Sequence, residues 1–177
     1  ETNEVFFDGL EVPESNLIGE EGRGFHYILS GMNTERILLA SESVGDALYF
    51  VDRSTEYARE RIVFQRPIGQ NQGVQFPIAR AYIHTQAAAA LRDRAVQLYE
   101  DEASCGAEAN MCKLLASEAA WEAANVAMDT FGGYGLAEEY GIERKFREAR
   151  LYLIAPIANN LILSYVGQHV LGMSRSF

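Results

Sequence analysis

The sequence predicts a mainly α-helical protein, an antiparallel up-down four-helix bundle preceded by a short β strand or hairpin. From Phe25 onward, apolar residues recur about every three and a half residues, which is the period of an amphipathic helix. Short segments rich in glycine, proline or polar residues interrupt this pattern. Because short links place consecutive helices side by side and antiparallel, the helices are expected to form a bundle.

The first residues carry a different pattern. The stretch "ETNEVFFDGLEVPESN" alternates apolar and polar residues, as a half-buried strand and hairpin would, but no partner strands follow it. We therefore interpret residues 1–22 as the tail of a sheet that begins upstream, and residues 23–177 as the helical bundle.

The first two helices are predicted on either side of a clear break. The first helix is expected from the Gly24 region to about Arg61, where the segment "FQRPIGQNQG" ends it with Pro67 and nearby glycines. Its inward face is predicted to carry Ile37, Ala40, Val44, Leu48, Val51 and Ala58. The inward face of the second helix is predicted to carry Phe76, Ala79, Ile83, Ala87, Leu91, Arg94 and Leu98.

The third helix is predicted between the interruptions "EDEASCGA" and "FGGYG", with alanines that let neighbouring helices approach closely. Its inward face is predicted to carry Met111, Leu115, Ala119, Ala123 and Val126. A short charged helix is expected around residues 137–147. The last helix is predicted to have Pro156 in its first turn, where a missing N–H costs little. Its apolar stripe is predicted to carry Ile157, Leu161, Tyr165 and His169.

Composition excludes several classes of partner. The chain has 177 residues, 48% of them hydrophobic, which suffices for the core of one domain. Its net charge of -10 repels nucleic acid and anionic membranes, so neither is an expected partner. No apolar run is long enough to cross a bilayer. Cys105 and Cys112 stand too far apart on a helix for a disulfide, which favours a reducing, cytoplasmic location.

Candidate site residues are ambiguous when each is taken alone. No metal site is expected, because the three histidines are far apart and lack zinc or di-iron spacing. The turn at Gly132 and Gly133 could simply end a helix, or could expose N–H groups to a phosphate or a ring edge. Arg61 suits the C-terminal end of a helix dipole. Glu35 could support the first turns of a helix or serve as a catalytic base.

Several segments of the chain are informative when they are taken together. They are "FFDGLEVPESNLIGEEGRGF", "ERILLASESVGDAL", "YARERIVFQRPIGQNQGVQF", "FGGYGLAEEYGIERKFREARL" and the closing helix. In order and spacing they resemble the C-terminal part of the acyl-CoA dehydrogenase family, flavoproteins that desaturate acyl-CoA thioesters between the alpha and beta carbons. The resemblance implies that residues 1–22 end a middle β domain and that residues 23–177 form the C-terminal four-helix bundle.

The resemblance also implies the ligands and the assembly. It implies FAD as cofactor, an acyl-CoA substrate, and an electron-transfer flavoprotein or a similar electron acceptor. Assembly is expected as a homodimer or homotetramer through the bundles, or as a heteromer. The implied cofactor contacts are Arg61, Phe64 and Gln72, on the FAD of a neighbouring subunit, and Gly132 and Gly133, in a turn along the same cofactor.

The chemistry of the family requires a carboxylate. An alpha proton of a thioester is weakly acidic, so a base must remove it while the developing enolate is stabilised. Most family members place that glutamate just before the last helix, where this chain has Pro156. Others, resembling isovaleryl-CoA and long-chain dehydrogenases, use a glutamate in the first bundle helix, directly before an arginine. Glu35 and Arg36 match this pair, so Glu35 is the expected base and Arg36 the residue that orients or tunes it.

Pro156 raises a second question, because family members bind the thioester carbonyl with the backbone N–H at this position, and proline has none. Ala158 likewise stands where the family usually has a threonine that contacts the flavin. Three interpretations stay open: Ile157 supplies the donor, the carbonyl is bound differently, or the site is inactive. In the last case the chain would be a catalytically silent subunit that completes a partner's FAD site. An oxidase that uses molecular oxygen is a further alternative.

Overall fold

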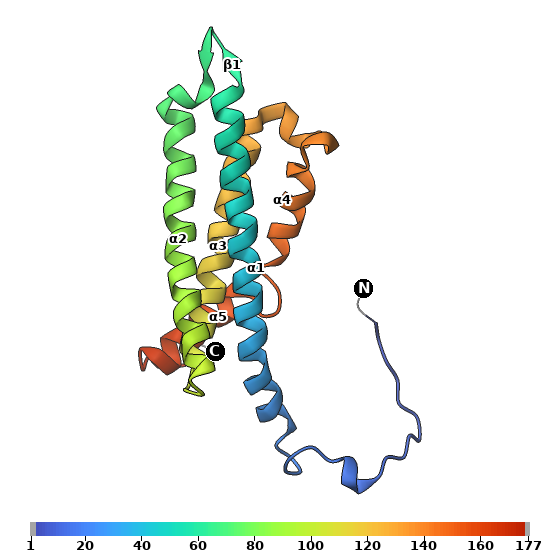
Figure 1. Cartoon of the computed structure of the whole chain (residues 1–177). Coiled ribbons are helices and arrows are strands. Elements are labelled where there is room, and N and C mark those ends of the chain that lie inside the picture. The colour runs from blue at the N-terminus through green and yellow to red at the C-terminus, as the bar shows by residue number, and fades with distance from the viewer. Residues whose placement is uncertain (1–2, 176–177) are drawn as a thin grey trace.

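The computed structural model describes residues 3–175. Three long helices lie side by side, α1 (Gly24–Glu60), α2 (Gln72–Glu100) and α3 (Gly106–Phe131) (Figure 1). Two shorter helices follow them, α4 (Ile142–Leu151) and α5 (Asn159–Tyr165). The chain runs up α1, down α2, up α3 and down α4, so the predicted mainly helical, up-down arrangement is confirmed (Figure 1).

A two-stranded hairpin joins α1 to α2, where the sequence indicated only a break. Its strands, β1 (Ile62–Val63) and β2 (Arg66–Pro67), pair antiparallel. Phe64 and Gln65 form the turn between them, with φ angles of 50° and 66°. Two successive positive φ angles give the tight turn that matches strand twist, and this turn normally uses Asn and Gly. The hairpin therefore holds a phenylalanine at its tip in a conformation that is uncommon for this residue.

Small residues fill the space between the three long helices. The inward face of α1 agrees with the prediction, because Ile37, Ala40 and Val44 are buried. The predicted face of α2 is correct only in part: Leu91 and Leu98 pack against the core, but Phe76 and Ile83 are exposed. In the first half of this helix two bulky apolar residues lie on the outer face, so periodicity favoured the wrong stripe there. The residues of α2 that are buried are Ile78, Ala81, Thr85, Ala88 and Ala95.

The last helix is shorter than predicted and begins later. Pro156 does not lie in its first turn but in the link that precedes α5. Ala158 is extended, with φ −65° and ψ 141°, so helical geometry starts only at Asn159. A single turn of wider π-helix, residues 166–170, continues α5. Its buried side chain is Ile162, whereas the predicted Leu161 is exposed. The fourth position of the bundle is thus divided between α4 and α5.

Residues 3–23 precede the bundle as an exposed, extended segment. They contain a single short 3-10 turn, Glu14–Asn16, and no strand. The hairpin that alternation predicted at this end is therefore not formed in the described part, because a strand needs a partner for its ladder of hydrogen bonds. Glu1 and Thr2, where the predicted strand begins, lie outside the described residues.

Candidate functional site

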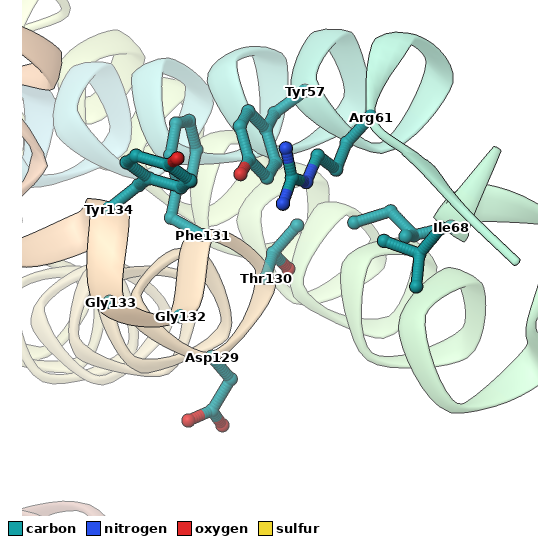
Figure 2. A pocket seen from close by; sticks show the side chains of 10 residues that line it. Tyr57, Arg61, Ile68, Asp129, Thr130, Phe131, Gly132, Gly133 and Tyr134 are labelled. Carbon is teal, nitrogen blue, oxygen red and sulfur yellow. The ribbon is translucent and has the colours of Figure 1, made fainter.

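A pocket of about 490 Å³ lies where the end of α1 meets the end of α3 (Figure 2). It brings together three of the predicted cofactor residues, Arg61, Gly132 and Gly133, which are about seventy positions apart in the chain. Tyr57 and Tyr134 also line it. Tyr57 precedes Arg61 by one helical turn, so both side chains leave α1 on the same face.

Aromatic rings hold the Arg61 side chain in place. The Tyr57 ring stacks on Phe131 with a centroid separation of 4.2 Å and an interplanar angle of 19°. The guanidinium carbon of Arg61 lies 5.4 Å from the centroid of the Tyr134 ring, within the range of a cation–π contact. Burial raises the pKa of Tyr57, and the nearby Arg61 opposes this shift. The pocket therefore presents a fixed positive charge beside flat apolar faces.

Glycines leave the other wall of the pocket open. Gly132 ends α3 with φ 57°, and its N–H donates to the carbonyl of Met128. A Cβ atom placed on Gly132 or Gly133 would meet no heavy atom within 4 Å, so a ligand could approach the backbone there. Asp129 also lines the pocket, but its carboxylate points away from Arg61 (Figure 2). Charge, shape and ring faces together suit a planar, anionic ligand.

Two other predicted cofactor residues lie outside this pocket. Phe64 is 94% exposed at the tip of the hairpin. Gln72 begins α2 and lines a different pocket of about 360 Å³, together with Phe76 and Arg80. The structure therefore groups Arg61 with the glycine turn, and leaves Phe64 and Gln72 on the outer surface near the same end of the bundle.

The predicted base lies far from the Arg61 pocket. Glu35 is 26 positions before Arg61, or roughly 39 Å along the helix axis. Its side chain is exposed, whereas the neighbouring Arg36 is buried. Arg36 Nη1 donates to Asn33 Oδ1 at 3.0 Å, and its Nε has no hydrogen-bond partner among residues 3–175. Burial lowers the pKa of Arg36, while Tyr165 and Glu35 oppose this shift, so the Glu35 and Arg36 charges do interact.

Glu35 shares a flank of α1 with two residues that contact the link between α4 and α5. Glu42 and Asp46, seven and eleven positions later, share this flank because both spacings are close to whole helical turns. The Tyr152 hydroxyl, at the start of the link, donates to Glu42 Oε1 at 3.0 Å and to Asp46 Oδ2 at 3.1 Å. Further along the link, Ile157 lines a pocket of about 480 Å³ that Arg36 also lines.

One buried residue near this link was missed by the sequence analysis. Lys113, on α3, is only 1% exposed. Its Nζ donates to the carbonyl of Ile157 and to Asn159 Oδ1, both at 2.8 Å. Burial lowers the pKa of Lys113 to about 8, and the Arg36 charge adds to this effect. The signal that could have revealed it is a lysine on an apolar helical stripe, between Cys112 and Ala116.

Within residues 3–175, no group of three or more His, Cys, Asp and Glu side chains could hold a metal ion. Both cysteines are free and buried, as predicted. None of the helices in the described part is long and apolar enough to cross a membrane.

Comparison with known proteins decides the family. Residues 22–171 match the sequence family described as acyl-CoA dehydrogenase, C-terminal domain. The chain belongs to the acyl-CoA dehydrogenase family. An acyl-CoA dehydrogenase of Bacillus subtilis is 38% identical over 171 residues, which cover 97% of this chain and 45% of the relative. FadE12 of Mycobacterium tuberculosis, also named an acyl-CoA dehydrogenase, is 35% identical over 98% of this chain and 45% of its own length.

Solved protein structures have the same fold as this chain. Glutaryl-CoA dehydrogenase in complex with glutaryl-CoA superimposes with a TM-score of 0.89 and 31% identity, covering 97% of this chain and 44% of that structure. The FAD complex of PigA gives a TM-score of 0.88 and 28% identity, over 94% of this chain and 43% of that structure. The chain thus spans a little under half the length of the acyl-CoA dehydrogenases that it matches.

Proposed function

We propose that this chain is the C-terminal domain of a FAD-dependent acyl-CoA dehydrogenase, which introduces a double bond between the alpha and beta carbons of an acyl-CoA thioester. The observation that carries the proposal is the family match over residues 22–171, combined with a pocket that joins Arg61 to the glycine turn. Bound FAD would supply the acceptor for the hydride that leaves the beta carbon. The residues of this chain would bind the ligands and remove the alpha proton.

Glu35 is the proposed base. Pro156 has no carboxylate, so the link before α5 cannot supply one at the position that most family members use. Glu35 shares a flank of α1 with two residues that contact this link, and its exposed side chain is accessible to a substrate. A thioester that covers the carboxylate would displace water from it, and this desolvation raises the pKa of a carboxyl group towards that of the carbon acid.

Arg61, Gly132 and Gly133 are the proposed cofactor residues of the pocket. The guanidinium would bind the diphosphate, because arginine matches phosphate geometry with parallel N–H groups. Phe64 and Gln72 would contact the same cofactor from the outer surface. Since Glu35 and Arg61 are roughly 39 Å apart along α1, they would serve two different flavins, which requires an assembly of subunits, either a homodimer or homotetramer or a heteromer. The proposed electron acceptor is an electron-transfer flavoprotein.

The test is flavin reduction by acyl-CoA in the FAD-loaded full-length protein. With oxygen excluded, wild-type flavin should lose its absorbance when substrate is added. Glu35→Gln keeps the shape of the side chain but cannot take a proton, so the rate should fall roughly 100-fold or more while FAD stays bound. Glu42→Gln, on the same flank of α1, should retain the wild-type rate. Equal rates in wild type and Glu35→Gln would remove Glu35 from the mechanism.

A second candidate is a catalytically silent subunit that completes the FAD site of a partner. The missing N–H at Pro156 favours it. Under this alternative Arg61→Ala should lower the activity of the assembly, whereas Glu35→Gln should not. Under the first candidate both changes lower activity. Activity assays on assemblies that mix mutant and wild-type subunits distinguish the two outcomes.

A further inference from the structure

Among residues 3–175, Lys113 is a buried cation that forms no ion pair with a carboxylate. Buried ammonium groups are normally paired with an acid, since removing a charge from water is costly. The Lys113 Nζ instead donates to two neutral oxygens of one short segment, the carbonyl of Ile157 and the side chain of Asn159. Ser117, one turn later on α3, makes a further bond with Asn159 at 3.1 Å. The buried ammonium group of Lys113 therefore holds the segment that contains Ile157 and Asn159 against α3.

The segment that Lys113 holds is fixed at both ends. At its start, Tyr152 donates to Glu42 and Asp46 of α1. At its end, Lys113 binds it to α3. Pro156 lies between these two anchors. The link is therefore suspended between two helices of the bundle, and its backbone position depends on both contacts.

Two backbone donors follow Pro156 in this segment. Within residues 3–175, the N–H groups of Ile157 and Ala158 donate to no other backbone group, and both residues are only half-buried. The Lys113 cation bonds to the Ile157 carbonyl, which belongs to the same peptide unit as the Ala158 N–H. A charged donor at the carbonyl polarises the peptide and makes its N–H a stronger donor. Ile157 also lines the pocket that Arg36 lines.

We infer that Lys113 is a positioning residue that fixes this segment so that the N–H groups of Ile157 and Ala158 bind the thioester carbonyl, in place of the N–H that Pro156 lacks. This inference rests on the proposed function. Enolate formation requires donors aimed at that oxygen, and the N–H of proline is missing. Lys113 itself does not contact the reacting atoms.

The test measures how strongly the protein prefers a ligand with a carbonyl. A 2-enoyl-CoA thioester and the matching thioether, in which a CH₂ group replaces the carbonyl, are titrated against the FAD-loaded full-length protein. Flavin absorbance reports both Kd values. Wild type should prefer the thioester, and Lys113→Met should reduce that preference roughly tenfold, the size expected when a well-placed donor is lost. If Lys113 were only structural, Lys113→Met would weaken the binding of both ligands equally and leave the preference unchanged.

Control variants separate this effect from general destabilisation. Arg53→Met removes another hydrogen-bonded cation, which donates to Glu56 on the same helix, α1, at 3.0 Å, and should leave the preference at its wild-type value. If Lys113→Met does not fold, Asn159→Ala releases the same segment from its own side and should reduce the preference in the same direction. An unchanged preference in folded Lys113→Met protein overturns the positioning role of Lys113 but leaves the proposed function standing. Failure of wild type to bind the thioester overturns the proposed function.

Discussion

Glu35 and Arg36 are neighbours in the chain but have different environments. Successive helical residues point about 100° apart, so one of them lies at the edge of the buried face and the other within it. Arg36 is 5% exposed and has a hydrogen bond to Asn33, whereas Glu35 faces the surface. A fixed cation thus stands beside a carboxylate that a substrate can reach.

Cys112 gives a pH-dependent contribution to stability. Burial raises the pKa of this thiol from 9.0 to about 12. Above pH 9 the unfolded chain loses the thiol proton while the folded chain keeps it, so the free energy of unfolding falls as the pH rises. Between pH 8 and pH 11 this one group should cost about 2 to 3 kcal/mol.

Chemical denaturation of wild type and Cys112→Ser checks this expectation. Serine does not titrate, so the stability of the variant should fall less steeply between pH 8 and pH 11. The comparison at pH 8, where the thiol is protonated in both states, gives the cost of the substitution alone. Parallel stability curves for the two proteins would show that the thiol does not contribute.

Single residues were the hardest features to predict from sequence. Arg61 and the glycine turn could be assigned through family resemblance, but their meeting in one pocket depends on the ends of α1 and α3 coming together. Lys113 was missed because its acceptors lie 44 and 46 positions away, in a link whose path no periodicity describes. Long-range polar contacts of this kind leave no local pattern in the chain.

At the level of elements, the end of α3 determines the shape of the proposed cofactor pocket. Gly132 has φ 57° and ψ −134°, a combination that residues with a Cβ strongly avoid. Gly132→Ala should therefore destabilise the protein by about 1–3 kcal/mol. Gly133 has no such constraint and open space around it, so Gly133→Ala should change stability by less than about 0.5 kcal/mol.

Chemical denaturation and FAD titration separate the two glycine variants. Gly133→Ala should fold normally but weaken FAD binding, because its methyl group occupies the open wall of the pocket. A Gly132→Ala protein as stable as Gly133→Ala would mean that the end of α3 is not strained.

The bounds and the buried face of a helix were predicted well where its apolar residues lie on one face, as in α1. The buried face was predicted less well where bulky apolar residues lie on two faces, as in α2. The first helix was predicted from the Gly24 region to about Arg61, and the structure gives Gly24–Glu60. The second helix was found, but the first half of its inward face was wrong, because Phe76 and Ile83 point outward. The last helix was predicted too early, because a proline suits a first helical turn as well as the preceding link.

At the level of the whole molecule, alanines set the spacing of the bundle. Ala88 of α2 is fully buried between the helices, and the adjacent Ala87 is exposed. Ala88→Leu should cost about 1–3 kcal/mol, since extra carbons in a packed core force neighbouring side chains apart. Ala87→Leu, with similar helix propensity, should change stability by less than about 0.5 kcal/mol. Thermal unfolding of the two variants checks the inward face of α2, and equal losses would contradict it.

The arrangement of the molecule places the proposed base and the Arg61 pocket at opposite parts of α1. Under the proposed function, such a chain would contribute to two flavin sites when copies assemble. The outward-facing bulky residues of α2, among them Phe76, Tyr82 and Ile83, are consistent with further contacts on that side.

Exchange of the alpha proton tests the role of Glu35 most directly, because it reports proton removal without requiring electron transfer. In D₂O, the FAD-loaded full-length protein should incorporate deuterium at the alpha carbon of a bound acyl-CoA. Glu35→Gln should slow this incorporation roughly 100-fold or more, while Glu42→Gln exchanges at the wild-type rate. Deuterium incorporation at the wild-type rate in Glu35→Gln would contradict proton removal by Glu35.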